Sequence, residues 1–237
     1  SSLFYDFVNS KKRKVAQTNI NATELRQFKF HLPSLDAQNK FLEVMEKTEH
    51  LRNLRCKANE NPDKITKSLF SEIFGGPDSR RFSEKKLGDL CVVSMGGTPS
   101  TQKPEYWKDG TVNWMKSGDI KGEFISVIPQ KITELGMKNS NTRMYQKGDV
   151  VIALNGQGKT RATTGILEIE TTSNQSVASL SPKTGLNSIY LYFNLKYRYQ
   201  ELRDLTGDKQ RSGLNLKLLR NLKLSLPPIE LQEKFAL

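Results

Sequence analysis

Cysteine and histidine are scarce in this sequence of 237 residues, which contains two of each. Cys56 and Cys91 lie in different segments, and no further Cys or His stands at the spacing of a zinc site. We therefore predict that the chain binds no metal and no cofactor. Two unpaired thiols are typical of a reducing compartment, so we expect the protein to be cytoplasmic.

Long apolar runs are also missing. The longest, Val150–Leu154, is far shorter than the roughly 20 apolar residues of a membrane-spanning helix. The first residues do not show the charged-then-apolar order of a signal peptide. We expect no contact with a membrane.

Recognisable catalytic patterns are lacking as well. Pro77-Asp78 with Glu84 and Lys86 weakly resembles the PD…ExK pattern of metal-dependent nucleases, but the residues between them read as a linker rather than as strands, so we interpret the match as chance. The two histidines have no sensible Ser or Cys partner. The Asn/Asp-Pro-Pro-Tyr tetrapeptide used in amino-methyl transfer does not occur. We find no active site and predict that the chain is not an enzyme.

Positive charge is abundant. Lys and Arg number 37 and Asp and Glu 25, so the net charge is 37 − 25 = +12 and the pI is about 9.6. Such an excess predicts attraction to a polyanion, most commonly a nucleic acid. The alternative is a basic surface that only maintains solubility. With 36% hydrophobic residues, the chain has enough apolar side chains for a large folded domain, or for a domain plus an arm.

One segment of the sequence occurs twice. Asn21–Phe41 reads NATELRQFKFHLPSLDAQNKF and Asn215–Phe235 reads NLKLLRNLKLSLPPIELQEKF, an offset of 215 − 21 = 194 residues. Upstream, SSLFYDF at Ser1–Phe7 is similar to NSIYLYF at Asn187–Phe193. This period is too long for a solenoid of short repeats. It indicates a duplicated domain that is cut out of phase, with the tail of one copy, one whole copy and the start of a third junction.

The first third of the chain reads as mostly helical. We predict a short helix at Leu3–Val8, a basic run at Lys11–Lys14, and a strand at Phe28–Leu32 that Pro33 ends. A helix then begins near Ser34 or Asp36, and its apolar stripe consists of Phe41, Val44, Met45, Thr48, Leu51, Leu54 and Ala58. Pro62 suits the first turn of a second helix that ends at Phe74. This part of the sequence predicts a helical arm whose apolar stripe would pack against a partner helix.

From Lys86 onward, short β-rich segments alternate with glycine turns. The predicted strands are Cys91–Ser94, Val112–Lys116, Phe124–Ile128, Val150–Leu154, Thr164–Ile169, Val177–Ser181 and Leu222–Leu226, with a helix at Ser188–Leu205. The fold class that follows is α+β, a β-rich domain with flanking helices and a long helical arm.

Three loops of this domain carry groups that bind DNA. They span residues 96–108, 155–161 and 206–213, and Lys, Arg, Asn and Gln on loops are the side chains that read base edges and contact phosphates. For any one loop the alternative is a solvated surface loop, and Trp107 is equally compatible with the core. The candidate DNA-binding residues are Thr98, Ser100, Thr101, Gln102, Lys103, Trp107, Lys108, Asn155, Gln157, Lys159, Thr160, Arg161, Lys209, Gln210, Arg211 and Ser212.

The second loop also permits another interpretation. Ala153–Thr160 fits the loose form of a phosphate-binding loop, which requires a helix to open at its Lys-Thr. The residues that follow, RATTGILEIETT, show no helical stripe. A nucleotide-dependent enzyme therefore remains the alternative function, and a scaffold that does not bind DNA is a third.

The motifs of the chain resemble those of the specificity subunits of type I restriction-modification enzymes. The resemblance rests on the two LP…Q.KF junctions, Gly96–Ser100, Asn113–Ile120, Lys147–Val151, Asn174–Ser176 and Gly213–Asn215, which occur in family order over essentially the whole chain. It implies that the recognition domain of this chain reads one half of a split DNA site. It also implies that separate modification and restriction subunits supply the chemistry.

The same resemblance implies a division of the chain. Residues 1–33 would be the tail of a preceding recognition-domain repeat, 34–76 the helical spacer, 77–226 the target recognition domain and 227–237 the start of a second spacer helix. In the family, spacer helices pack antiparallel. The implied partners are double-stranded DNA, modification (methyltransferase) subunits and the restriction subunit through the complex. The chain departs from the family in holding one full recognition domain and only the start of the second spacer, so we expect a second copy of this chain to pair antiparallel through the stripe of the arm.

Overall fold

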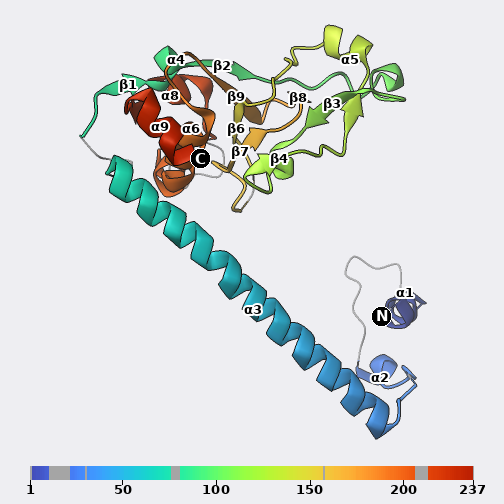
Figure 1. The fold of residues 1–237 in the computed structure, drawn as a ribbon. Coiled ribbons are helices and arrows are strands. Elements are labelled where there is room, and N and C mark those ends of the chain that lie inside the picture. Colours follow the sequence, from blue (N-terminus) through green and yellow to red (C-terminus); the bar gives the residue numbers. More distant parts are fainter. Residues whose placement is uncertain are drawn as a thin grey trace. The chain divides into compact units, whose positions relative to one another are not determined.

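The computed structural model describes residues 2–10, 22–29, 31–75, 81–156, 158–205 and 213–236 (Figure 1). The chain divides into two units, Ser1–Pro62 and Asp63–Leu237. Within the described residues, none of the helices is both long and apolar enough to cross a membrane.

The first unit begins with two short helices, α1 (Ser2–Ser10) and α2 (Ala22–Leu25). Phe28 follows α2 and packs against two rings of α1, at 5.2 Å from Phe4 and 5.0 Å from Phe7 between ring centroids. The helix predicted at Leu3–Val8 is therefore confirmed. The predicted strand at Phe28–Leu32 is wrong for the described residues, because Phe28, Lys29, His31 and Leu32 form no strand.

The arm is a single helix, α3 (Leu35–Phe74), of 40 residues. The Ser34 hydroxyl accepts a hydrogen bond from the Ala37 amide at 3.3 Å, so Ser34 caps it as predicted. The predicted break before Pro62 is wrong, since Pro62 lies inside the helix. A proline removes one hydrogen bond, whereas a break would leave two sets of unpaired end groups and require a new helix nucleus, which is also costly.

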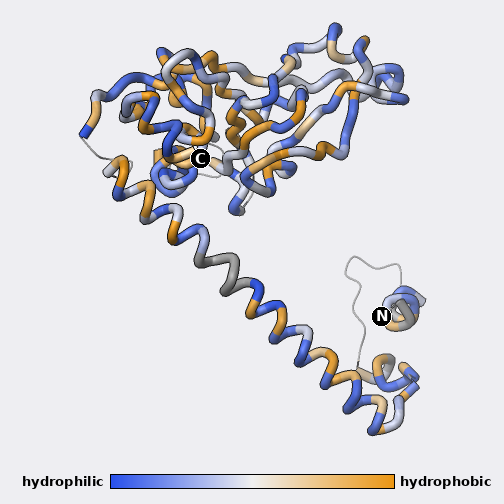
Figure 2. Tube along the Cα trace, viewed as in Figure 1, coloured by the Kyte–Doolittle hydropathy of each residue, from blue (hydrophilic) through white to orange (hydrophobic). Residues whose placement is uncertain are grey.

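The predicted stripe of α3 is exposed. Phe41, Val44 and Leu51 each retain more than 60% of their accessible surface, and Met45 and Leu54 about half. In Figure 2, hydrophobic positions recur between hydrophilic ones along this helix. Thr48 donates its hydroxyl hydrogen to the Val44 carbonyl oxygen. Ala58 lies within α3, but its side chain is outside the described residues.

The described residues of the second unit form ten strands in three sheets. The strands are β1 (Glu84–Lys86), β2 (Cys91–Met95), β3 (Val112–Met115), β4 (Phe124–Ile125), β5 (Lys131–Ile132), β6 (Val150–Ala153), β7 (Thr164–Leu167), β8 (Thr172–Ser173), β9 (Val177–Pro182) and β10 (Lys223–Ser225). A five-stranded sheet has the order β2-β9-β6-β7-β4, a three-stranded sheet β5-β3-β8, and a two-stranded sheet β1-β10.

Strand β6 is at the centre of the core and is buried on both faces. Val150 and Ile152 belong to a cluster with the helices, whereas Val151 and Ala153 belong to a second cluster that includes Met115 of β3. Alternate residues of a strand point to opposite faces, so the five-stranded sheet lies between a helical layer and the three-stranded sheet. This explains why β6 reads as a continuous apolar run rather than an alternating one.

The helices of the second unit are α4 (Leu87–Leu90), α5 (Glu134–Lys138), α6 (Ser188–Tyr197), α7 (Tyr199–Asp204), α8 (Leu216–Asn221) and α9 (Ile229–Ala236). Two short 3-10 helices, η1 (Pro104–Tyr106) and η2 (Ser117–Asp119), flank β3. Helix α6 packs against β6, β7 and α9, and α8 packs against α4 and β2 (Figure 1). These helices and mixed sheets confirm the α+β class.

The single helix predicted at Ser188–Leu205 is two helices that meet at Arg198. The buried guanidinium of Arg198 binds the Glu201 carboxylate with both Nε and Nη2 at 2.6 Å, and donates to the Lys223 carbonyl oxygen at 2.6 Å. Because this arginine binds both the Glu201 carboxylate and the Lys223 backbone, it stabilises the turn between α6 and α7. Of the predicted strands, that at Phe124–Ile128 is shorter than expected, since β4 ends at Ile125.

Candidate nucleic-acid interface

The topology of the five-stranded sheet brings two of the predicted DNA-binding loops to the same edge. Strands β2 and β6 both run antiparallel to β9, which lies between them. They are therefore parallel to each other, about 10 Å apart, and their carboxyl ends lie at one edge. Met95 pairs with Ala178 and Ala153 with Val177, so the loops that follow leave the sheet side by side.

The turn that precedes β9 joins these two loops. The Gly97 amide donates to the Ser173 carbonyl oxygen at 2.9 Å, and on the other side the Leu154 amide donates to the Ser176 carbonyl oxygen at 2.8 Å. Asn174 stabilises the turn, because its Oδ1 accepts from the Ser176 amide at 3.0 Å. We call this region, made of residues 96–108, 154–156, 158–161 and 174–176, the loop edge.

The first loop has a fixed base and an exposed tip. Gly96 and Gly97 are buried, and a Cβ on Gly97 would lie 2.8 Å from the Thr142 amide nitrogen, so only glycine permits this approach. Thr98 donates to Gln175 Oε1 at 2.7 Å, and Lys103 donates to the Tyr106 hydroxyl at 3.1 Å. The exposed candidates of this loop are Thr98, Ser100, Thr101, Gln102, Lys103 and Lys108.

Trp107 contributes to the rigidity of the loop. Its indole Nε1 donates to the Ser100 carbonyl oxygen at 3.0 Å, and its ring packs edge-to-face on Trp114 at 5.0 Å between centroids. Trp114 in turn donates to the Gly97 carbonyl oxygen at 2.9 Å. The indole N–H of Trp107 is thus engaged within the protein, which favours the core interpretation. A DNA contact by its ring stays a prediction.

The second loop is anchored on helix α7. The Tyr199 hydroxyl donates to the Lys159 carbonyl oxygen at 2.7 Å, and Arg203 donates to the Arg161 carbonyl oxygen at 3.1 Å. These contacts engage only the backbone of the loop. The side chains of Asn155 and Lys159 are exposed, whereas those of Thr160 and Arg161 are half-buried. Gln157 lies outside the described residues.

The end of the third loop adjoins the second. The Leu214 amide donates to the Leu154 carbonyl oxygen at 2.9 Å, and the Asn155 side chain occupies the space where a Cβ of Gly213 would stand. The candidates Lys209, Gln210, Arg211 and Ser212 lie outside the described residues. Their position at the loop edge therefore stays a prediction.

Sequence reasoning missed a fourth segment beside the first loop. A groove of about 460 Å³ is lined by Thr98 together with Lys138, Asn139, Ser140 and Asn141, which follow or end α5. The sequence Lys138–Arg143, KNSNTR, is rich in the same residue types as the predicted loops. Composition is the one sequence signal of this segment, because it has neither a glycine pair nor a predicted strand end beside it.

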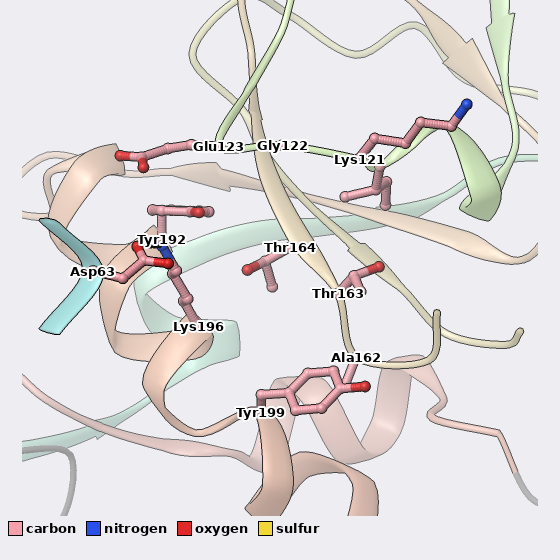
Figure 3. A pocket seen from close by; sticks show the side chains of 11 residues that line it. Asp63, Lys121, Gly122, Glu123, Ala162, Thr163, Thr164, Tyr192, Lys196 and Tyr199 are labelled. Atoms are coloured by element: carbon pink, nitrogen blue, oxygen red, sulfur yellow. Dashed lines mark hydrogen bonds and ion pairs between the residues drawn. The ribbon is translucent and has the colours of Figure 1, made fainter. Parts of the chain in front are cut away.

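A second hollow lies beside α6 and differs in chemistry. This cleft of about 440 Å³ is lined by Asp63, Glu123, Tyr192, Lys196, Tyr199 and residues around Thr163 (Figure 3). Lys196 binds Asp63 at 2.9 Å. Burial, together with the charges of Glu123 and Asp63, raises the pKa of Tyr192, so its phenol stays protonated. A phosphate here would meet two carboxylates, so the cleft does not suit DNA.

The structure does not support the nucleotide-binding interpretation of the second loop. A phosphate-binding loop needs the N-terminus of a helix directly after its Lys-Thr. Residues 161–163 instead form a turn and β7 begins at Thr164. The backbone of Lys159 and Arg161 is held by α7 side chains rather than arranged around an anion.

Comparison with known proteins identifies the family. Residues 80–236 match the model of the type I restriction modification DNA specificity domain, and the chain belongs to this family. The prediction of a specificity component rather than an enzyme is thereby confirmed. One curated relative is the type I restriction enzyme MjaIX specificity subunit of Methanocaldococcus jannaschii, 30% identical over 175 residues that cover 70% of this chain and 39% of the relative.

Further relatives agree. The EcoR124I/EcoR124II specificity subunit of Escherichia coli is 23% identical over 155 residues, which cover 63% of this chain and 38% of that subunit. The HsdS subunit from Thermoanaerobacter tengcongensis has a similar fold, with a TM-score of 0.56 and 20% identity over 99% of this chain and 58% of that chain. A structure that addresses complex assembly and conformational transition of the type I R-M system gives a TM-score of 0.59 at 19% identity, over 100% of this chain and 59% of that chain. The chain thus spans about two fifths to three fifths of the length of these relatives.

Proposed function

We propose that this chain recognises a DNA sequence through its loop edge and reads one half of a bipartite target for a type I restriction-modification complex. The observation that carries the proposal is the convergence of residues 96–108 and 154–161 at one edge of the sheet. Exposed Lys103, Lys108 and Lys159 lie on these loops, where they would neutralise phosphates. The net charge of +12 supports the same conclusion.

The loops suit recognition because their backbones are fixed while most of their candidate side chains are exposed. Hydrogen bonds from Trp107, Trp114, Tyr199 and Arg203 hold the backbone carbonyl groups. Side chains on a rigid frame lose less entropy on binding than those on a mobile loop. Amide, hydroxyl and basic groups would then read base edges, which phosphate contacts alone cannot do.

We further propose that the chain acts within an assembly. Relatives are named as specificity subunits of type I restriction enzymes, and one structural neighbour is described in the context of complex assembly. On this basis, modification (methyltransferase) subunits would bind the chain directly and a restriction subunit would join through the complex. A second copy of the chain, paired antiparallel through the α3 stripe, would supply the other half-site.

The test of DNA recognition is selection from a pool of random-sequence duplexes, followed by titration of salt. We expect an enriched sequence motif and an affinity that falls steeply with salt, by about 0.9 in the log–log slope for each phosphate contact. A combined Lys159/Arg161/Gln210/Arg211 alanine variant should weaken binding and change the selected motif. The control is Lys85/Gln146/Lys147/Lys217→Ala, which removes the same charge outside the loops.

Two outcomes would contradict the proposal. Binding that does not change with salt would exclude recognition through phosphates, and an alanine variant with unchanged affinity and motif would exclude the loop edge. The alternative of a nucleotide-dependent enzyme predicts nucleotide binding that Lys159→Ala abolishes. The alternative of a scaffold predicts no DNA binding even at low salt.

A further inference from the structure

We propose that the segment Lys138–Arg143 is a fourth DNA-contacting segment of the loop edge, in which Asn141 reads a base edge and Lys138 and Arg143 contact phosphates. This inference rests on the proposed function. It assigns a role to residues that the sequence patterns did not indicate, and it follows from where the fold places them.

The segment is joined directly to the first loop. A Cβ on Gly97 would lie 2.9 Å from the Asn141 carbonyl carbon and 2.8 Å from the Thr142 nitrogen, so the two backbones are in contact. Thr142 is buried, and its hydroxyl donates to the Ser173 carbonyl oxygen at 2.9 Å. Ser173 also accepts from the Gly97 amide, so one residue fixes both segments at the loop edge.

Hydrogen bonds make the backbone of the segment rigid. The Thr133 hydroxyl caps α5 by accepting from the Gly136 amide at 3.1 Å. At the other end of the helix, the Asn139 side-chain amide donates to the Leu135 carbonyl oxygen at 2.9 Å, and Ser140 donates to the Met137 carbonyl oxygen at 3.2 Å. Asn139 and Ser140 are therefore occupied in ending the helix.

Asn141 differs from these two residues. It is exposed, and within the described part of the chain its side-chain amide has no hydrogen-bond partner. Lys138 and Arg143, on either side, are exposed and have no ion pair with any described residue. An amide flanked by two unpaired cations, on a fixed backbone beside a polar groove, has the chemistry of a base contact between two phosphate contacts.

The cleft beside α6 provides the contrast. Its lysine, Lys196, is paired with Asp63 and stacks over the rings of Tyr192 and Phe193 at about 5.5 Å. The charge there is satisfied within the protein. The charge at Lys138 and Arg143 is not, and a polyanion is the partner that would satisfy it.

The fold supplies matched controls on the turn before β6. Gln146 and Lys147 are exposed on the turn that precedes β6, whereas the second loop follows β6. They carry the same kinds of groups at the opposite end of this strand. Gln146→Ala is the control for Asn141→Ala, and Lys85→Ala/Lys147→Ala, which also removes two exposed positive charges, is the control for Lys138→Ala/Arg143→Ala.

The experiment is selection of random-sequence duplexes by the full chain and by each variant, with the affinity for the selected site measured over a range of salt. Asn141→Ala should reduce the preference at one base pair about 10-fold and leave the other positions unchanged. Lys138→Ala/Arg143→Ala should weaken all duplexes alike and lower the log–log salt slope by about 1.8. The controls should match the unchanged chain, and melting curves establish that each variant is folded.

The outcomes separate this inference from the proposed function. If the unchanged chain selects a motif but Asn141→Ala and Lys138→Ala/Arg143→Ala behave as their controls do, the fourth segment is refuted and the loop edge stands. If the unchanged chain selects no motif, both ideas are refuted. If Asn141→Ala does not fold, Asn141→Asp provides the same test, because it keeps the shape and converts the amide donor into an acceptor.

Discussion

The two copies of the repeated junction have nearly the same local structure, but one is packed against the domain core and the other is exposed. Helix α2 begins at Ala22 and α8 at Leu216, while α3 begins at Leu35 and α9 at Ile229, an offset of 194 in both cases (216 − 22 and 229 − 35). Even one side-chain bond recurs, since Gln38 donates to the Pro33 carbonyl oxygen and Gln232 to the Pro227 carbonyl oxygen, each at 2.8 Å.

The copies differ in what covers them. Phe235 packs against Phe70, Phe74 and Phe193, at 5.3 to 5.5 Å between ring centroids. Its counterpart Phe41 is 64% exposed. Helix starts and capping bonds are therefore properties of the local sequence, whereas burial depends on the rest of the domain.

The strand at the junction shows the same dependence. In the second copy, Lys223–Ser225 forms β10 because β1 pairs with it, with Lys85 opposite Leu224. The equivalent residues of the first copy that the structure describes have no such partner and form no strand. An alternating pattern predicts a strand only where a second strand supplies hydrogen bonds.

The largest effect is expected at the exposed stripe of α3. If two chains pair through it, Leu51→Asp should convert a dimer into a monomer, because an unpaired charge in an apolar interface costs several kcal/mol. Light scattering in the micromolar range measures the change. The control Asn53→Asp places the same carboxylate on the opposite face of the helix.

A monomeric unchanged chain would contradict the pairing of arms and leave the proposed role in DNA recognition unaffected. A dimer that survives Leu51→Asp would show that another surface joins the chains. Either result would mean that the stripe of a second chain does not cover the first copy of the junction.

Truncation of the two equivalent phenylalanines should change the free energy of unfolding by different amounts. Phe235→Ala should lower the free energy of unfolding by about 3 kcal/mol, since it removes a ring from an aromatic cluster. Phe41→Ala should change it by less than about 0.5 kcal/mol in the monomer. Urea unfolding measures both. Equal effects would mean that the first copy is covered as well.

A smaller difference is expected for the equivalent glutamines. Gln232 is buried, accepts from the Asn187 amide and donates to the Gly185 and Pro227 carbonyl oxygens, so Gln232→Ala leaves buried groups unpaired and should cost about 2 kcal/mol. Gln38 is half-buried, and its side-chain amide donates to the Pro33 carbonyl oxygen, so Gln38→Ala should cost much less. Comparable losses in urea unfolding would argue against the difference in burial.

The last comparison changes no residue. The Leu226 amide donates to the Ser83 carbonyl oxygen at 2.9 Å, whereas Leu32, its counterpart 194 residues earlier, lies in a segment without strand structure. Hydrogen exchange should therefore be much slower at Leu226 than at Leu32. Protection of Leu32 would reveal a strand partner for the first copy.

Much of the molecule follows from the sequence. The apolar runs of β6 and β9, the cap at Ser34 and the stripe of α3 are local patterns, and the structure contains each corresponding element. The basic composition and the family motifs led to DNA recognition, which the family match supports. Periodicity and capping involve residues only a few positions apart, so they can be predicted without a tertiary structure.

Other features were decided only by the tertiary structure. The turn at Arg198 and the absence of a strand in the described residues of Phe28–Leu32 depend on partners distant in sequence, whereas the continuity of α3 through Pro62 depends on the balance of local helix energies. The same is true of the interface. The sequence by itself determined which residues are suited to contact DNA, but only the pairing of β2 and β6 with β9 placed two loops at one edge, and only the contact of Gly97 with Asn141 added the segment Lys138–Arg143. Strand pairing joins residues far apart in the chain, and no local pattern encodes which strands become neighbours.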